Sequence, residues 1–194
     1  MNYRDELLFL FDGSIFTFTG TNNTEYRVWI EGIDETEATE EAFELDENGE
    51  PKFPLIYEAL SVKNPELINL CSAAIRLSIQ KDDSFETAGL MIISEDWWAK
   101  NSFHINELSI SKDFQHIGLG TLLIKYLQEA AFIANKDAIT LQCYKDDFES
   151  EDIYEARQRF YESLGFEPHF EILRQLMTYS VTGEVIYRKL KGKA

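Results

Sequence analysis

The sequence predicts an α/β domain in which strands and helices are intermixed along the chain. Short runs of β-branched, aromatic and aliphatic residues between turn residues recur from end to end, which is typical of strands. Two longer runs, at residues 121–135 and 153–164, are typical of helices. A length of 194 residues and an apolar fraction of 44% suit one domain with a substantial core.

The first half of the chain contains predicted strands and a capped helix. Residues 7–11 and 15–18 flank the pair Asp12-Gly13, which is typical of a hairpin turn. Residues 26–30 alternate like a strand, and Asp34 is placed to cap a helix that runs to about residue 45. The elements expected after the loop at 48–54 are a short helix at 55–60, a helix from 65 to about 72, and a strand at 75–80.

The second half places most of its predicted strands around the two longer helices. These strands are expected at residues 85–94, 104–111, 138–144, 170–173, 177–182 and 184–190. Gly165 follows the second helix and is expected to end it. The last two strands would form a C-terminal hairpin across Thr182-Gly183. Within residues 104–111, alternation puts Leu108 and Ile110 on one face and Glu107 and Ser109 on the other.

The chain is strongly acidic, with a formal net charge of −17. Direct binding to a nucleic-acid backbone would need a basic patch, and none is visible in the sequence. Residues 31–50 contain ten acids and no Lys or Arg. This acidic run is either a solvated helix face that keeps the protein soluble or a surface that attracts a cationic partner.

The apolar runs are all shorter than the roughly 18 residues that span a bilayer. The N-terminal segment carries acids and lacks the basic flank of a signal peptide, so we expect a cytoplasmic protein without membrane contact. The two cysteines, Cys71 and Cys143, lie in apolar runs without metal-ligand spacing. They are expected to be buried, reduced thiols, and no metal site is expected.

Residues 115–120 read Gln-His-Ile-Gly-Leu-Gly and form the most informative stretch of the chain. The glycines Gly118 and Gly120 lie between a strand-like run and an apolar helical run. Glycine takes positive φ without strain and lets backbone N–H groups crowd around an anion. The following helix directs its unpaired N–H groups to the same place. The pattern predicts a phosphate-binding loop, and it lacks the third glycine of a Rossmann fingerprint and the Gly-Lys-Ser/Thr of a Walker A loop.

Two segments of this sequence resemble motifs of the GNAT acetyltransferase superfamily. Residues 107–120 resemble motif A, and residues 156–166, which end in Tyr-Glu-Ser-Leu-Gly-Phe, resemble motif B. The motifs occur in the family's order and at a familiar distance. The resemblance extends over about residues 26–190 and implies a mixed, mostly antiparallel central sheet flanked by helices. It leaves residues 1–23 as an added N-terminal β-hairpin and residues 24–194 as a GNAT-like acetyltransferase domain.

The resemblance also implies a cosubstrate, acetyl-CoA, and a set of residues that bind it. The strand residues that would pair with the pantetheine amides are Leu108, Ser109 and Ile110. The residues that would wrap the pyrophosphate are Gln115, His116, Ile117, Gly118, Leu119, Gly120 and Thr121. Family members often carry Arg or Lys just before the first glycine, where this chain has His116 and Ile117. The backbone N–H groups would therefore matter more, and His116 is either a further phosphate donor or an exposed loop histidine.

Two side chains are candidates for the chemistry of acetyl transfer, which needs a neutral amine and a proton for the departing thiolate. Tyr161 matches the motif-B tyrosine that often protonates the thiolate, and a phenol is protonated at neutral pH. The alternative is an aromatic residue on a core-facing helix stripe. Glu107 occupies a position where several family members carry an acid that accepts the amine proton, and it could equally be a surface acid. His104 is expected to be a packed or exposed histidine rather than a base.

The resemblance implies an N-acetyltransferase whose acceptor is a small amine, a polyamine or a protein amino group. The acidic composition favours a cationic acceptor, without direct binding of nucleic acid, and leaves a homodimer open. One alternative is a GNAT fold that binds CoA or a partner and has lost catalysis. Another is an acidic protein that mimics nucleic acid and sequesters a basic partner through residues 31–50.

Overall fold

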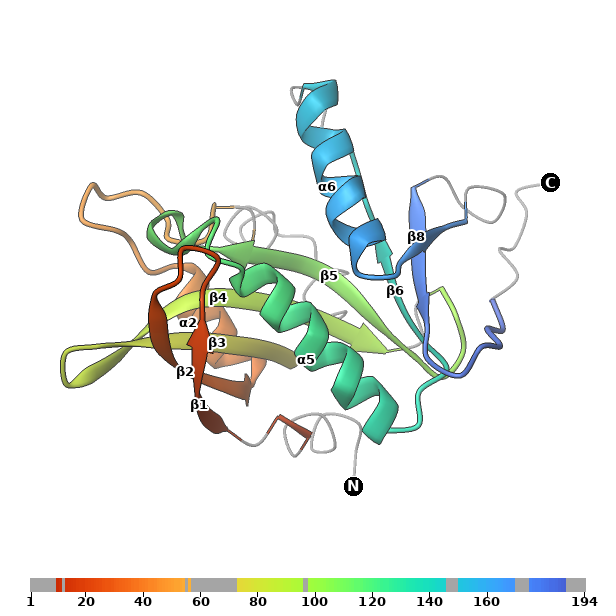
Figure 1. Cartoon of the computed structure of the whole chain (residues 1–194), viewed down its shortest axis with the longest axis horizontal. Coiled ribbons are helices and arrows are strands. Elements are labelled where there is room, and N and C mark those ends of the chain that lie inside the picture. The colour runs from red at the N-terminus through yellow and green to blue at the C-terminus, as the bar shows by residue number, and fades with distance from the viewer. Residues whose placement is uncertain are drawn as a thin grey trace. The chain divides into compact units, whose positions relative to one another are not determined.

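The computed structural model describes residues 10–11, 13–54, 56, 73–95, 98–145, 150–169 and 175–187. The chain divides into two compact units. Unit 1 comprises Met1–Ser94 and Asn106–Tyr126, and unit 2 comprises Glu95–Ile105 and Leu127–Ala194. Strand β5 (Ser102–Ile110) and helix α5 (Leu119–Ile133) each contribute residues to both units (Figure 1).

The described strands are hydrogen-bonded in the order β1-β2-β3-β4-β5-β6-β8-β7. Their bounds are β1 Ser14–Thr19, β2 Glu25–Ile33, β3 Ala73–Lys81, β4 Ser84–Glu95, β5 Ser102–Ile110, β6 Ala138–Gln142, β7 Glu167–Pro168 and β8 Leu176–Ser180. The β5–β6 ladder is parallel, whereas the β1–β2, β2–β3, β3–β4, β6–β8 and β7–β8 ladders are antiparallel. The prediction of a mixed, mostly antiparallel sheet with helices is confirmed.

A hairpin lies near the N-terminus, but its strands are β1 and β2 rather than the predicted residues 7–11 and 15–18. Strand β1 pairs with β2 from Ser14↔Ile30 to Thr19↔Glu25, so the chain reverses at residues 20–24. The turn residue Asn23 has φ of 61°, and asparagine tolerates this left-handed region. Residues 10–11 lie in a helical turn and a turn rather than a strand, and residues 7–9 and 12 lie outside the described ranges.

Helix α2 (Glu35–Ala42) begins where the sequence predicted. The Asp34 carboxylate accepts hydrogen bonds from Thr36 N at 2.8 Å and Glu37 N at 3.1 Å, and the Glu37 carboxylate accepts from Asp34 N at 3.3 Å. This reciprocal capping satisfies backbone donors that the first turn leaves unpaired. The helix ends at Ala42, earlier than expected, because the chain then turns back in a loop that pairs Leu45 with Pro51.

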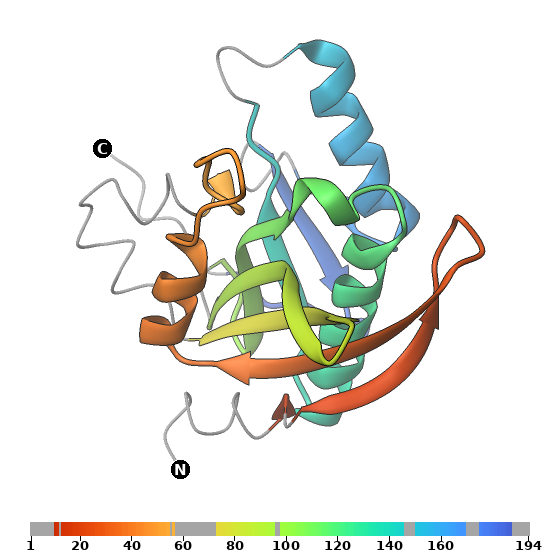
Figure 2. The same cartoon turned by 90° about the vertical axis from the view of Figure 1, so that its left-hand side faces the viewer.

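The two faces of the unit 1 sheet are covered by different helices (Figure 2). On one face, α2 takes part in a buried cluster of Ile33, Ala38, Ala42, Phe53, Ile56, Ala74, Leu90 and Ile92. On the other face lies the first half of α5. A Cβ at Gly89 would come within 2.8 Å of Ile110 Cδ1 and 3.1 Å of Leu123 Cδ1, so β4, β5 and α5 pack closely at this glycine. Ile110 therefore lies on the α5 face, and alternation puts Glu107 on the α2 face.

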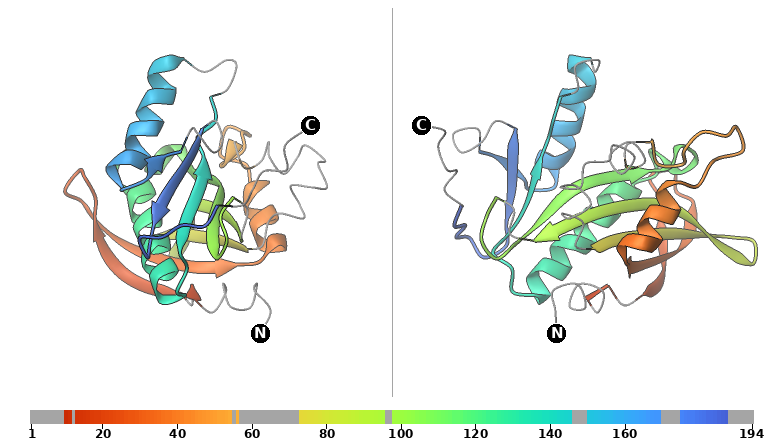
Figure 3. Two further views of the ribbon diagram at one scale, coloured as in Figure 1. Left: turned by 90° about the vertical axis from the view of Figure 1, so that its right-hand side faces the viewer. Right: turned by 180° about the vertical axis from the view of Figure 1, so that it is seen from behind.

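Unit 2 contains the first half of β5, strands β6, β7 and β8, and helix α6 (Glu151–Ser163). Figure 3 shows β6 and β8 side by side, paired from Ala138↔Ser180 to Gln142↔Leu176. Helix α6 stops at the predicted glycine, because Gly165 adopts φ of 86°. The predicted strand at 184–190 is wrong for its described part, since residues 184–186 have no strand and Tyr187 forms an isolated bridge with Ala99.

Several predicted elements cannot be compared in full with the structure. The strand at 170–173, most of the helix at 55–60, and the helix from 65 to about 72 lie outside the described residues. The two-residue strand β7 was missed by the sequence reasoning because it is too short to show a period. Within the described ranges, no helix combines the length and apolar character needed to cross a bilayer.

His104 is buried in unit 2, so of the packed and exposed surroundings expected for this histidine the structure shows the packed one. Its ring Nδ1 shares a hydrogen bond of 2.8 Å with Thr140 Oγ1 on β6. Burial lowers the pKa of His104 from 6.5 to about 3. The ring is therefore neutral in the folded protein at physiological pH, and folding is coupled to its protonation.

We expect His104 to destabilise the protein in acid. Its pKa is lower in the folded than in the unfolded state, so its contribution to stability is intact above about pH 6.5 and is lost as the pH falls toward 3. The free energy of unfolding should fall by up to about 1.36 kcal/mol per pH unit through this group. Urea unfolding between pH 5 and 8 measures the slope, because carboxylates titrate little there.

The variant His104→Gln separates this group from the rest of the chain. Its slope below about pH 6.5 should be shallower than that of the wild type, and the two slopes should coincide between pH 7 and 8. Parallel curves over the whole range would show that the His104 ring does not couple protonation to folding.

Candidate active site

The second half of β5 continues beyond its ladder with β6. The parallel ladder with β6 runs from Ser102↔Ala138 to Ile105↔Leu141, and residues 106–110 continue β5 beyond its last pair. A strand that continues beyond its neighbour can bond an extended ligand along that side. The residues predicted to pair with pantetheine, Leu108, Ser109 and Ile110, all lie in this part of β5.

The loop after β5 has an unusual backbone. A 3-10 turn, η1 (Lys112–Phe114), leads into the predicted phosphate-binding loop, and α5 begins at Leu119. His116 has φ of 63° and Gly118 has φ of 97°, so two left-handed residues flank Ile117. Glycine takes this conformation freely, whereas a residue with a Cβ is strained there. Backbone turns of this kind collect N–H groups into an anion-binding concavity.

The carbonyls of His116, Ile117 and Gly118 in this loop all accept hydrogen bonds from the protein. Thr21, at the tip of the β1–β2 hairpin, donates from Oγ1 to His116 O at 2.6 Å and from its backbone N–H to Ile117 O at 3.1 Å. The Gly118 carbonyl accepts from Leu122 N at 3.0 Å as the first hydrogen bond of α5. These three carbonyl oxygens are therefore already hydrogen-bonded within the protein.

The backbone N–H groups of the same loop are not hydrogen-bonded to the protein in this way. Within the described part of the chain, the N–H groups of residues 116–121 have no protein acceptor. The N–H groups of Leu119, Gly120 and Thr121 belong to the first turn of α5, whose dipole adds partial positive charge. A loop with satisfied carbonyls and available N–H groups fits a phosphate group, and it fits the pyrophosphate of acetyl-CoA.

Two predicted ligand side chains have other surroundings in the structure. Gln115 donates from Nε2 to Ile110 O at 3.0 Å, which ties the loop to the end of β5. His116 is exposed and contributes its carbonyl to the Thr21 contact. Gln115 therefore supports the loop through its side chain, and its backbone N–H donates to Lys112 O at 3.5 Å.

Glu107 lies in the part of β5 that continues beyond the last pair with β6. It is half-buried, and its carboxylate accepts a hydrogen bond from Leu108 N at 3.2 Å. The neighbouring Asn106 was not singled out from the sequence. Its amide Nδ2 is buried and, among the described residues, finds no acceptor. Buried polar groups are nearly always paired, so an orphaned donor next to Glu107 is consistent with a ligand at this strand.

Tyr161 belongs to unit 2 and lies in an aromatic cluster. Its side chain is 8% exposed and packs edge-on against Phe160 and Phe166, with ring centroids 5.1 Å and 5.7 Å apart. Phe166 in turn contacts Tyr179. The end of the helix is held by Gln128 on α5, which donates from Nε2 to Leu164 O at 2.8 Å. This packing fixes the position of the Tyr161 ring on α6.

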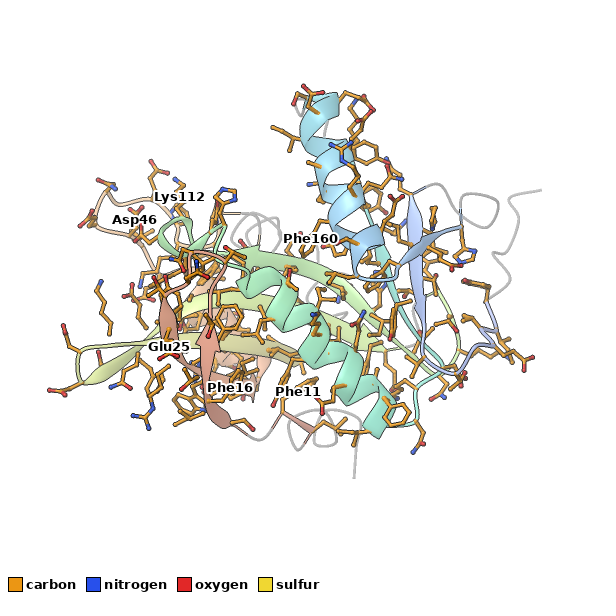
Figure 4. The ribbon with its side chains drawn as sticks, in the orientation of Figure 1. Phe11, Phe16, Glu25, Asp46, Lys112 and Phe160 are labelled. Atoms are coloured by element: carbon orange, nitrogen blue, oxygen red, sulfur yellow. The ribbon has the colours of Figure 1, made fainter. Side chains whose placement is uncertain are left out.

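The acidic run lies partly beside the phosphate-binding loop. The pKa of Asp46 is lowered mainly by hydrogen bonds from the backbone of Glu50 and Asn48, and further by the charge of Lys112 (Figure 4). Lys112 opens η1, so the loop after α2 approaches the start of the phosphate-binding loop.

The remaining candidates from the sequence do not form a further site. Cys143 is buried, as expected, and Cys71 lies outside the described residues. Across the ranges that the structure describes, no group of three or more His, Cys, Asp or Glu residues could hold a metal ion. Thr21 was missed by the sequence reasoning. Its polar turn could be read from Gly20-Thr21-Asn22-Asn23, but its contact with residues nearly a hundred positions away could not.

The comparisons with known proteins agree with this geometry. Residues 78–168 match the family model described as an acetyltransferase (GNAT) domain. A search of curated protein sequences finds no match. The solved structure of AtaTR bound with AcCoA is 16% identical, covers 79% of this chain and 93% of that chain, and superposes with a TM-score of 0.54.

Other solved structures share the fold at similarly low sequence identity. The KacTA–DNA complex is 20% identical over 79% of this chain and 93% of that chain, with a TM-score of 0.52. A cAMP-binding acyltransferase from Mycobacterium smegmatis is 11% identical over 92% of this chain and 50% of that chain, with a TM-score of 0.50. The matched residues 78–168 include the phosphate-binding loop and Tyr161, and this region of the chain corresponds to a GNAT acetyltransferase domain.

Proposed function

We propose that this enzyme transfers the acetyl group of acetyl-CoA to a cationic amine. The observation that carries the proposal is the loop at residues 116–121, in which Thr21 and α5 occupy the carbonyls of His116, Ile117 and Gly118 and leave the N–H groups available. Such an arrangement suits the pyrophosphate of a CoA thioester. Acetyl-CoA supplies the activated acetyl group when it is bound.

The binding residues act mainly through their backbone. Gln115, His116, Ile117, Gly118, Leu119, Gly120 and Thr121 would hold the pyrophosphate. Leu108, Ser109 and Ile110 would pair with the pantetheine amides, which is supported by the position of residues 106–110 beyond the last β6 pair. We also propose that residues 1–23 are an extension of an acetyltransferase domain at residues 24–194. Strand β1 of this extension pairs with β2 of the domain.

Tyr161 and Glu107 are the groups that we assign to proton transfer. Tyr161 would donate its phenolic proton to the thiolate that leaves, and its packing against Phe160 and Phe166 supports a fixed hydroxyl position. Glu107 would accept the proton of the attacking amine, directly or through water. Its half-buried carboxylate at the strand edge, on the α2 face, supports this assignment.

The acceptor class follows from charge. The net charge of −17 and the approach of the α2 loop to Lys112 favour a cationic substrate. Six of the ten acids in the run bond other protein groups, and these are Glu31, Asp34, Glu37, Glu41, Glu44 and Asp46. The exposed acids Glu40, Glu47 and Glu50 are the best candidates to attract a cation.

CoA should stabilise the wild-type protein against heat, and Gly118→Val should abolish the effect. Ligand at a hundredfold excess over Kd adds about 2.7 kcal/mol to the free energy of unfolding. A β-branched residue cannot hold the φ of 97° that orients the loop. The control is Gly183→Val, which changes a glycine of similar φ, 88°, with nothing within 4 Å of the added Cβ. An unchanged CoA shift in the Gly118 variant would contradict the phosphate-binding role.

Tyr161→Phe should lower kcat by about 10²–10⁴, as expected for a lost general acid, and leave the Kd for CoA nearly unchanged. Phenylalanine preserves the aromatic packing, so the fold should persist. Tyr179→Phe removes a hydroxyl from the same cluster and should retain normal turnover. Steady-state kinetics together with calorimetric CoA binding measure both effects, and a wild-type kcat in the Tyr161 variant would make this residue a packing residue.

Glu107→Gln should reduce kcat/KM for the amine most at low pH, where the amine is protonated and needs a base. The carboxamide can still accept the hydrogen bond from Leu108 N, so the strand should be preserved. The pH–rate profiles of both proteins give the result. Profiles of identical shape would argue against a base role for Glu107.

The KM for the acceptor should rise with salt. Exposed charges are screened over about 8 Å at physiological ionic strength, so an attraction by surface acids weakens as salt increases. A polyamine and a Lys-rich peptide should be better substrates than an acidic amino acid. Replacing Glu40, Glu47 and Glu50 by glutamine should raise the low-salt KM and flatten its salt response. A preference for the acidic amino acid, or salt-independent kinetics in the wild type, would rule out this acceptor class.

A further inference from the structure

The tip of the β1–β2 hairpin lies beside the loop that precedes α5 (Figure 1), and Thr21 at this tip hydrogen-bonds to the loop. Thr21 donates from Oγ1 to His116 O at 2.6 Å and from N to Ile117 O at 3.1 Å. These are two consecutive carbonyls, bonded by the side chain and the backbone of the same threonine. The contact joins segments 95 residues apart in the sequence.

Because the peptide bond is planar, the bonds from Thr21 also fix the direction of the next N–H groups in the loop. In a trans peptide the carbonyl of one residue and the N–H of the next point in opposite directions. Holding His116 O therefore directs the N–H of Ile117 away from the hairpin, and holding Ile117 O does the same for the N–H of Gly118. Both N–H groups lack a protein acceptor within the described residues.

The loop conformation needs such support. His116 has φ of 63°, a region that residues with a Cβ rarely adopt. Strained residues of this kind persist where neighbouring groups hold them. The bond from Thr21 Oγ1 ends on the carbonyl of His116 itself, so it acts on the strained residue directly.

The hairpin tip is built to hold Thr21 in place. Gly20 and Asn23 close the turn through the backbone bonds Gly20 N to Thr24 O and Asn23 N to Gly20 O, both 2.9 Å. The Asn22 side chain adds bonds to Thr24 N at 3.1 Å and to the Tyr26 hydroxyl at 2.8 Å. A Cβ at Gly20 would lie 3.2 Å from Ile117 O, so the absence of a side chain there permits the close approach.

We propose that Thr21, at the tip of the β1–β2 hairpin, is a positioning residue for acetyl-CoA. Its hydrogen bonds orient the N–H groups of Ile117 and Gly118 toward the pyrophosphate. The inference rests on the proposed role of residues 115–121 as the pyrophosphate site. It gives the hairpin a function, as the support of the cosubstrate-binding loop. Thr21 itself touches neither the cosubstrate nor the acceptor in this proposal.

The test is Thr21→Val, which removes the hydroxyl at nearly constant shape and keeps the backbone bond. The Kd for CoA, measured by calorimetry, should rise about 5–10-fold, which corresponds to the loss of one neutral hydrogen bond. The KM for acetyl-CoA should rise in parallel, whereas kcat and the KM for the amine should not change. Thr21→Ser keeps the hydroxyl and should restore the wild-type Kd. Thr19→Val, at an exposed position of β1, is the matched control.

Two further measurements distinguish orientation of the loop from general stability. With S-acetylpantetheine, which lacks the pyrophosphate, Thr21→Val should have the same kcat/KM as the wild type. In the ligand-free protein, hydrogen exchange at the amides of residues 116–121 should be faster in Thr21→Val, while exchange in β3 and β4 is unchanged.

The outcomes separate this inference from the proposed function. If wild-type protein binds CoA and Thr21→Val binds it equally well, the positioning role is wrong and the proposed function stands. An equal loss with CoA and with S-acetylpantetheine would also overturn it, because the hydroxyl would then support the whole fold. If wild-type protein fails to bind CoA, the proposed function is wrong, and this inference with it.

Discussion

The candidate active site depends on two hydrogen bonds that hold a strained loop. The left-handed conformation of His116 costs about 1–2 kcal/mol for a residue with a Cβ. A typical neutral hydrogen bond contributes about 0.5–1.5 kcal/mol net, so the two bonds from Thr21 are of the size needed to offset that cost. The result is a loop whose carbonyls at residues 116–118 accept hydrogen bonds from the protein and whose N–H groups remain available for an anion. A flexible glycine loop would reach the same shape only after binding, at a cost in affinity.

The acidic character of the chain has two physical origins. Part of it is structural, because Arg76 on β3 is held between Glu31 on β2 and Glu41 on α2, and Asp34 and Glu37 cap that helix. These carboxylates are already paired or hydrogen-bonded and contribute less to the outer field. The exposed remainder, with a net charge of −17 for the chain, produces the potential that a cationic acceptor would meet. Net charge alone would overstate that attraction.

The residues proposed for catalysis are distributed over both units. The phosphate-binding loop and Glu107 belong to unit 1, and Tyr161 belongs to unit 2. Strand β5 and helix α5 each continue from one unit into the other. Each candidate is fixed within its own unit by local packing: the loop by Thr21 and Tyr161 by Phe160 and Phe166.

The sequence by itself determined the features that local rules govern. Asp34 caps a helix and Gly165 ends one because side-chain acceptors and positive φ act within a few residues, and Gly118 marks the loop for the same reason. The alternation in β5 predicts opposite faces for Ile110 and Glu107, and the structure places Ile110 on the α5 face. The tertiary structure decided what depends on partners distant in the chain. Strand β1 pairs with β2, residues 184–186 form no strand, His104 is buried neutral, and Thr21 reaches His116. Hydrogen bonds and burial between distant segments leave no periodicity in either segment, so only the folded chain reveals them.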